Sequence, residues 1–224
     1  LREIYAPPYL LFALGDISLL KEQRWLAIVG TRNPSPYGIK MTEQFTGELV
    51  QNGWGIISGL AKGVDACAHQ TALAYQGKTI AVLGCGIDYI YPYENKSLYT
   101  EIRQKGLLLS EMPLGTKPLP FQFPLRNRIV TGISRGVIVI EGDHKSGAMI
   151  SGKLALDQNR EVFALPGRAT DPLSNGPNWL IKQGAKPVMS TGDILEEFGD
   201  KQKPVLPQVK TQRSISLLGK EEVV

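Results

Sequence analysis

Short apolar segments, each followed by a turn of small residues and then by a helical stretch, recur along most of the chain and restrict the folds open to it. The first example is Trp25–Val29, a continuous apolar run that ends at Gly30. Ser35 and Pro36 follow, and this pair favours the N-cap and the first turn of a helix. This order of strand, turn and helix repeats without hairpin signals, which is typical of a parallel sheet covered by helices. We therefore predict an α/β fold with strands buried on both faces.

The same pattern predicts where the elements lie. Ligands in such sheets bind beyond the carboxyl ends of the strands, so the turns at Gly30, Ser58 and Gly84 should share one edge of the molecule. The expected strands are 25–29, 55–57, 79–83, 107–109, 136–140 and 161–165, with a short last strand in 186–189. The expected helices are 36–51, 64–76, 95–104, one that opens within 123–130, 149–158, 178–183 and a last turn or two in 192–198.

The two ends of the chain differ in composition from its middle. Residues 1–20 are expected to pack as a lead-in on a single main domain, residues 21–199. Residues 200–224 begin with Lys, Gln and two prolines and are expected to form a linker. No apolar run approaches membrane-spanning length. The two cysteines, Cys67 and Cys85, lack metal-ligand spacing, which favours buried free thiols and a reducing cytoplasm.

Charge and motif content favour binding over catalysis. The net charge is +4, a mild excess that permits nucleic acid as a partner without requiring it. The chain has no G-x-S-x-G motif, no Cys/His metal set and no Walker lysine. Glu111, Glu141 and Asp143 are the acids expected near the ligand edge, as caps or ion-pair partners. We expect no enzyme activity, no metal and no cofactor.

Two turns offer candidate phosphate sites. In the first, Gly30 and Arg32 precede a helix N-terminus whose free N–H groups favour an anion. An ordinary turn with a surface arginine explains this stretch equally well. In the second, Lys62 could reach a phosphate, Asp65 could cap the helix or join the site, and His69 is more simply a structural histidine.

A third candidate is a basic and aromatic cluster. Arg126, Asn127 and Arg128 lie at the start of a helix, with Phe121 and Phe123 just before them. Aromatic faces beside cations are what single-stranded nucleic acid needs, since bases stack and phosphates are neutralised. The alternative is that Phe123 is a core residue and both arginines are solvated. Lys145, Ser146 and Gly147 follow the fifth strand and could offer further phosphate contacts.

Taken together, these motifs resemble the DNA-processing protein A family (DprA, also called Smf). The resemblance covers roughly residues 5–198 and lies in the order of the motifs: V-G-T-R at 29–32, S-G-L-A-K-G-V-D at 58–65, F-P-L-R-N-R-I at 123–129, S-G at 146–147 and L-P-G at 165–167. It implies an extended Rossmann-like domain that binds single-stranded DNA. The DNA-binding residues would be Gly30, Thr31, Arg32, Ser58, Gly59, Lys62, Gly63, Phe123, Arg126, Asn127, Arg128, Lys145, Ser146 and Gly147.

The resemblance also implies a biological role. Members of the family protect incoming single strands during natural transformation and recombination in the cytoplasm, and they help load the recombinase RecA. They act as homodimers without turnover. The interface residues here would be Trp179, Leu180, Ile181 and Val188. Residues 1–20 would end a preceding helical domain, and the last residues would start a winged-helix domain.

Two functions of other classes compete with this one. A phosphoribohydrolase-like enzyme of Rossmann-like fold needs P-G-G-x-G-T-x-x-E, and neither 165–170 nor 142–147 fits it. A nucleotide sensor would bind a small phosphorylated ligand in the same pocket. The length of the preferred ligand distinguishes a sensor from a strand-binding protein.

Overall fold

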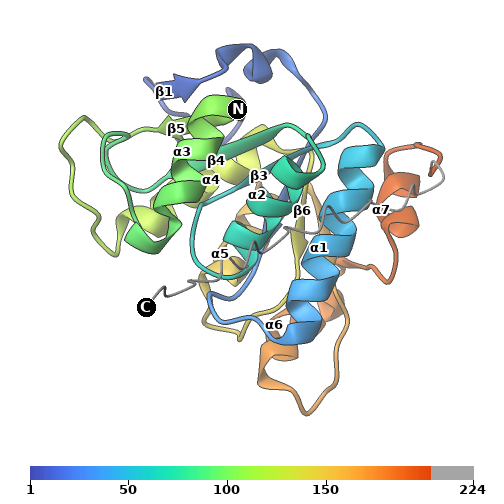
Figure 1. Cartoon of the computed structure of the whole chain (residues 1–224). Coiled ribbons are helices and arrows are strands. Elements are labelled where there is room, and N and C mark those ends of the chain that lie inside the picture. Colours follow the sequence, from blue (N-terminus) through green and yellow to red (C-terminus); the bar gives the residue numbers. More distant parts are fainter. Residues whose placement is uncertain (203–224) are drawn as a thin grey trace, which may run out of the picture.

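A computed structural model describes residues 1–202 of the chain as one mixed sheet with helices on both faces (Figure 1). Most of the predicted linker therefore lies outside the described residues. The strand order is β1-β5-β4-β3-β2-β6-β7-β8, and every neighbouring pair is parallel except β1 and β5. The strands are β1 (Phe12–Gly15), β2 (Trp25–Val29), β3 (Gly55–Ser58), β4 (Thr79–Leu83), β5 (Leu107–Ser110), β6 (Gly136–Val139), β7 (Glu161–Ala164) and β8 (Lys186–Pro187).

Side chains that alternate along the strands divide the helices between the two faces of the sheet. Ala27 and Val29 pack with α4, α5 and α6, whereas Leu26 and Ile28 pack with α1, α2 and α7. Helix α3 covers β4 and β5 on the α2 side. The α-helices are α1 (Pro36–Gln51), α2 (Val64–Ala74), α3 (Lys96–Lys105), α4 (Gln122–Ile133), α5 (Gly147–Asp157), α6 (Asn175–Lys182) and α7 (Thr191–Glu197).

The start of the chain adds a strand that the sequence analysis did not predict. Residues 12–15 pair antiparallel with β5 at one margin of the sheet, opposite the side where α7 lies (Figure 1). Ile4 is buried and packs near Gly132 of α4. The sheet is thus not purely parallel, because this short, half-exposed edge strand lacks the continuous apolar run that marks the buried ones.

The order of the strands fixes where a ligand can bind. Strands β3, β4 and β5 extend the sheet on one side of β2, whereas β6, β7 and β8 extend it on the other. The loops that follow β2 and β6 therefore diverge, and a crevice forms between them at the carboxyl ends of the strands. Cys67 and Cys85 are buried and free, as predicted. Within the described part of the chain, the helices are too short or too polar to cross a membrane.

Candidate nucleic-acid interface

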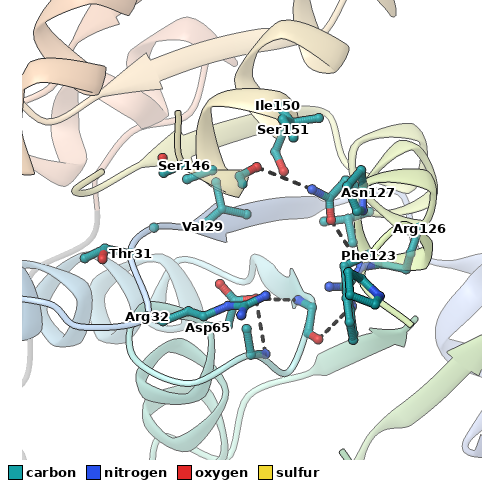
Figure 2. Close-up of a pocket in the computed structure, with 18 residues that line it drawn as sticks. Val29, Thr31, Arg32, Asp65, Phe123, Arg126, Asn127, Ser146, Ile150 and Ser151 are labelled. Carbon is teal, nitrogen blue, oxygen red and sulfur yellow. Dashed lines mark hydrogen bonds between the residues drawn. The ribbon is translucent and has the colours of Figure 1, made fainter. Parts of the chain in front are cut away.

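A pocket of about 440 Å³ occupies this crevice, at the ends of β2 and β3 and between α4 and α5 (Figure 2). Ser146, Ile150 and Ser151 stand on the side opposite Arg32 and Asp65. A smaller pocket adjoins it and shares part of its wall. The residues that line the larger pocket are Val29, Gly30, Thr31, Arg32, Gly59, Ala61, Asp65, Pro120, Phe123, Pro124, Arg126, Asn127, Val130, Ser146, Gly147, Ala148, Ile150 and Ser151.

The first loop is held in place by Glu141, which follows β6. Its main-chain carbonyl accepts from the Thr31 N–H at 2.7 Å. Its carboxylate accepts from the Ser35 N–H at 2.9 Å and from the Ser35 hydroxyl at 2.5 Å, while Ser35 Oγ caps α1 through the Gly38 N–H. The anion at the N-terminus of α1 is therefore the protein's own buried carboxylate. Of the two interpretations of this stretch, an open phosphate cradle and a turn with a surface arginine, the contacts at α1 favour the second, with Glu141 at the cap and Arg32 as the exposed cation of the loop.

The second loop is clamped from both sides of Gly59. The Gly59 N–H donates to Asp65 Oδ2 at 3.1 Å, and the Ala61 N–H donates to the same oxygen at 3.4 Å. The Gly59 carbonyl accepts from Arg126 Nη1 at 2.6 Å, and the Val82 carbonyl accepts from the same nitrogen. A Cβ at Gly59 would lie 2.6 Å from the guanidinium carbon, so any side chain there would displace the Arg126 clamp.

Burial perturbs the ionisable groups behind this wall. It raises the pKa of Asp65, against the opposing effects of Arg126 and the two N–H donors. It lowers the pKa of Arg126 to about 10, so the guanidinium keeps its charge at neutral pH. His69, whose Nδ1 lies 2.7 Å from Thr79 Oγ1, has its pKa lowered to about 3 by burial and then by Arg126. His69 is thus a neutral structural histidine, as predicted.

The structure separates the two arginines that were predicted to bind DNA together. Residues two apart on a helix point about 200° apart. Arg126 points into the pocket wall and is 6% exposed; its Nη1 donates to two main-chain carbonyls, and its Nε donates to Asn127 Oδ1 at 3.2 Å. Arg128 is absent from the pocket lining and pairs at 2.6 Å with Glu111, while its Nε donates to the Ala6 carbonyl. Arg128 therefore joins the lead-in to the domain, and Arg126 supports the pocket from behind.

The other residues predicted to contact DNA also lie partly in the pocket linings and partly outside them. Lys62 lines the smaller pocket and pairs with Glu94. Ser58 is fully buried and donates to the Ile28 carbonyl at 2.7 Å, so it lies behind the pocket surface. Gly63 lies against the main chain of the first loop, and the exposed Lys145 lies outside both pocket linings.

Helix α5 and α4 form the far wall of the larger pocket. Ser146 takes the N-cap position of α5, and Asn127 Nδ2 donates to the Gly147 carbonyl at 3.4 Å. Ser151 also lines the pocket, although the sequence analysis did not propose it. It lies four residues after Gly147, so helical periodicity was the signal that could have identified it.

Aromatic rings separate the two pockets. Phe123 lines both, and the Arg32 guanidinium lies 5.9 Å from the centre of its ring. Tyr91 stacks on Phe123 with ring centres 5.4 Å apart and planes at 29°. The sequence analysis did not propose Tyr91, since the Tyr91-Pro92 pair signals only a turn. A flat ring, a cation and a recessed pocket together can hold an unpaired base and its phosphate.

Two of the residues predicted for a dimer interface are too deeply buried to contact a second copy. Leu180 and Val188 have no exposed surface, because they pack in the cores on opposite faces of the sheet. Trp179 and Ile181 are half-buried. The Trp179 ring also contacts His144 and Lys153.

Comparison with known proteins agrees with this architecture. The sequence model for DNA recombination-mediator protein A matches residues 1–199. DNA processing protein DprA of Bacillus subtilis is 47% identical over 201 residues, which are 90% of this chain and 68% of that protein. The crystal structure of DprA from Streptococcus pneumoniae superposes with a TM-score of 0.84 at 47% identity, covering 88% of this chain and 69% of that one.

A third relative connects the fold with a ligand. The structure of DNA processing protein A from Helicobacter pylori, described for its single-stranded DNA binding mode, has a TM-score of 0.81 at 37% identity. The match covers 87% of this chain and 89% of that one. This chain belongs to the DNA recombination-mediator protein A family, which includes the DprA and Smf proteins.

Proposed function

We propose that this protein binds single-stranded DNA through the pocket between α4 and α5 and acts in DNA processing and recombination. The observation that carries the proposal is the Arg32 guanidinium over the Phe123 ring at the mouth of that pocket. It combines a stacking face for a base with a bidentate donor for a phosphate. The likeness to the Helicobacter pylori protein supports the same ligand.

The geometry favours a flexible single strand over a duplex. The pocket is recessed, so a base must leave its stack to reach Asn127 and Ser151. A base in a duplex would also have to break its base pair, which costs free energy. Among the described residues that line the pocket, the one carboxylate is Asp65, whose Oδ2 accepts from two main-chain N–H groups. A pair of carboxylates for acid–base chemistry is therefore missing from the part of the lining that the structure describes, which supports binding without turnover.

The wider role is part of the same proposal. The protein would protect incoming single strands during natural transformation in the cytoplasm and help load RecA onto them. Two copies would form a homodimer through the surface around Trp179 and Ile181. Two pockets on one strand would raise the overall affinity above that of either pocket alone.

Arg32→Ala is expected to weaken binding of oligo-dT roughly tenfold or more, because a charge-assisted contact is lost. The slope of log K against log salt should also fall by about one. Arg32 is exposed and has no ion-pair partner in residues 1–202, so the melting temperature should stay close to that of the original chain. Fluorescence anisotropy at several salt concentrations measures both quantities.

Arg103→Ala is the matched control for this experiment. Arg103 is an exposed arginine in the last turn of α3, away from both pocket linings and at the opposite end of the helix from Lys96, so its loss should leave affinity and salt slope nearly unchanged. Equal losses for both variants, or unchanged affinity for Arg32→Ala, would rule out the pocket as the binding site.

Ile181→Arg is expected to separate the proposed homodimer, since a buried unpaired charge is costly at an interface. Ile181 is half-buried in α6, so the arginine head can still reach solvent in the monomer. Light scattering should report half the molar mass of the original dimer. An unaltered mass would exclude this part of α6 from the interface.

A further inference from the structure

The loop between β4 and α3 presents three tyrosines at alternate positions. Tyr89 is 37% exposed, Tyr91 is 42% exposed and Tyr93 is 69% exposed. Single exposed aromatics are common on protein surfaces, but a group of them marks a surface that binds something. The loop follows the carboxyl end of β4, so it lies on the same edge of the sheet as the pocket.

Side-chain hydrogen bonds fasten this loop to the pocket. Asn95 Nδ2 donates to the Leu60 carbonyl at 2.9 Å and to the Ala61 carbonyl at 3.2 Å, both in the second loop. Glu94 pairs with Lys62. Asp88 accepts from the Gly115 N–H at 2.9 Å. The acids of the loop are thus engaged, and the tyrosines have a fixed position relative to the pocket.

Tyr91 connects this loop to the pocket wall. Tyr91 stacks on Phe123, and both rings line the smaller pocket together with Arg32. Tyr93, two residues after Tyr91, is exposed, and Lys96 Nζ lies 5.5 Å from the centre of its ring. Phe123 and Tyr93 therefore each combine an aromatic face with a cation, Arg32 at Phe123 and Lys96 at Tyr93.

We propose that the bound single strand leaves the pocket across Tyr91 and Tyr93 toward α3, with successive unpaired bases stacked on these rings. Lys62 and Lys96 are the cations beside its phosphates. Alternating rings with nearby cations bind single strands of any sequence, because every base has a flat face. The proposal rests on the pocket binding single-stranded DNA, and it specifies the direction in which the site extends.

Tyr93→Ala tests this path by comparing the binding of a short and a long oligonucleotide. Anisotropy titrations use labelled oligo-dT of about 5 and about 15 nucleotides, within the site sizes of known single-strand binders. We expect Tyr93→Ala to weaken binding of the longer oligonucleotide roughly fivefold or more and to leave the shorter one unchanged, because the shorter one ends in the pocket. Tyr93→Phe keeps the ring and should bind both as the original chain does.

Tyr9→Ala is the matched control, because Tyr9 is a fully exposed tyrosine in the lead-in, near the C-terminal end of α4 and outside both pocket linings. It should change neither affinity. Unchanged binding of the longer oligonucleotide by Tyr93→Ala would overturn the path, as expected if the tyrosines dock a protein instead. Equal losses at both lengths would overturn it too. If the original chain binds neither oligonucleotide, the proposed function itself fails, which is a different result from a path that fails alone.

Discussion

Arg126→Met is expected to lower the free energy of unfolding by about 3–5 kcal/mol, the usual cost of removing one partner from a buried charged network. The change leaves the Asp65 carboxylate without its counter-charge and the Gly59 and Val82 carbonyls without a charged donor. Binding of single-stranded DNA should weaken as well, because the second loop loses one side of its clamp. Urea unfolding followed by circular dichroism measures the first effect, and anisotropy measures the second.

Arg128→Met is the matched control on the same helix. It breaks an ion pair with Glu111 at the edge of the domain, outside the pocket lining. The two side chains are only 16% and 26% exposed, so we expect a cost of about 2 kcal/mol, less than for Arg126→Met, and an unchanged DNA affinity. Adding Asp65→Asn to Arg126→Met should recover part of the lost stability, since no charge is then left unpaired. Equal destabilisation by both arginine variants would contradict the clamp.

Gly63→Ala should have the second large effect, because it forces the two pocket loops apart. Gly63 has φ +76°, which disfavours any side chain, and an added Cβ would lie 2.7 Å from the main-chain carbon of Arg32. Strain of this kind costs about 1–3 kcal/mol. Relief of the overlap requires Thr31 and Arg32 to shift, so affinity for oligo-dT should fall at least as far as in Arg32→Ala.

Gly53→Ala separates the collision from the backbone strain. Gly53 has a similar φ of +82°, but nothing lies within 4 Å of an added Cβ. This variant should therefore lose some stability and keep its full affinity for DNA. Equal affinities for the two alanine variants would show that contact between the loops does not position Arg32.

Elements with strong local signals could be predicted from the sequence. The run Trp25–Val29 is the strand β2, and Ser35 with Pro36 marks the start of α1 because cap and first-turn preferences are local properties. The common edge for the turns at Gly30, Ser58 and Gly84 was also predictable, since parallel strands place their carboxyl ends together.

Features that depend on contacts between distant segments could not be predicted. Glu141 was expected near this edge as a cap or ion-pair partner, but no spacing rule indicates that its partner is Ser35 at the start of α1, 106 residues away in sequence. Strand β1 is stabilised by pairing with β5, not by its own pattern. The directions of Arg126 and Arg128 depend on how α4 packs on the sheet. Leu180 is buried in the core, but an apolar residue suits a core and an interface equally well, so the sequence could not distinguish the two.

The most direct test of the central claim is a competition experiment on the unmodified chain. Labelled oligo-dT would be bound and then competed with unlabelled single strand, duplex of equal length and mononucleotides, at low and high salt. We expect the single strand alone to compete efficiently and binding to weaken steeply as salt rises. Competition by a mononucleotide at a similar concentration would contradict strand binding and indicate a nucleotide sensor or a phosphoribohydrolase-like enzyme.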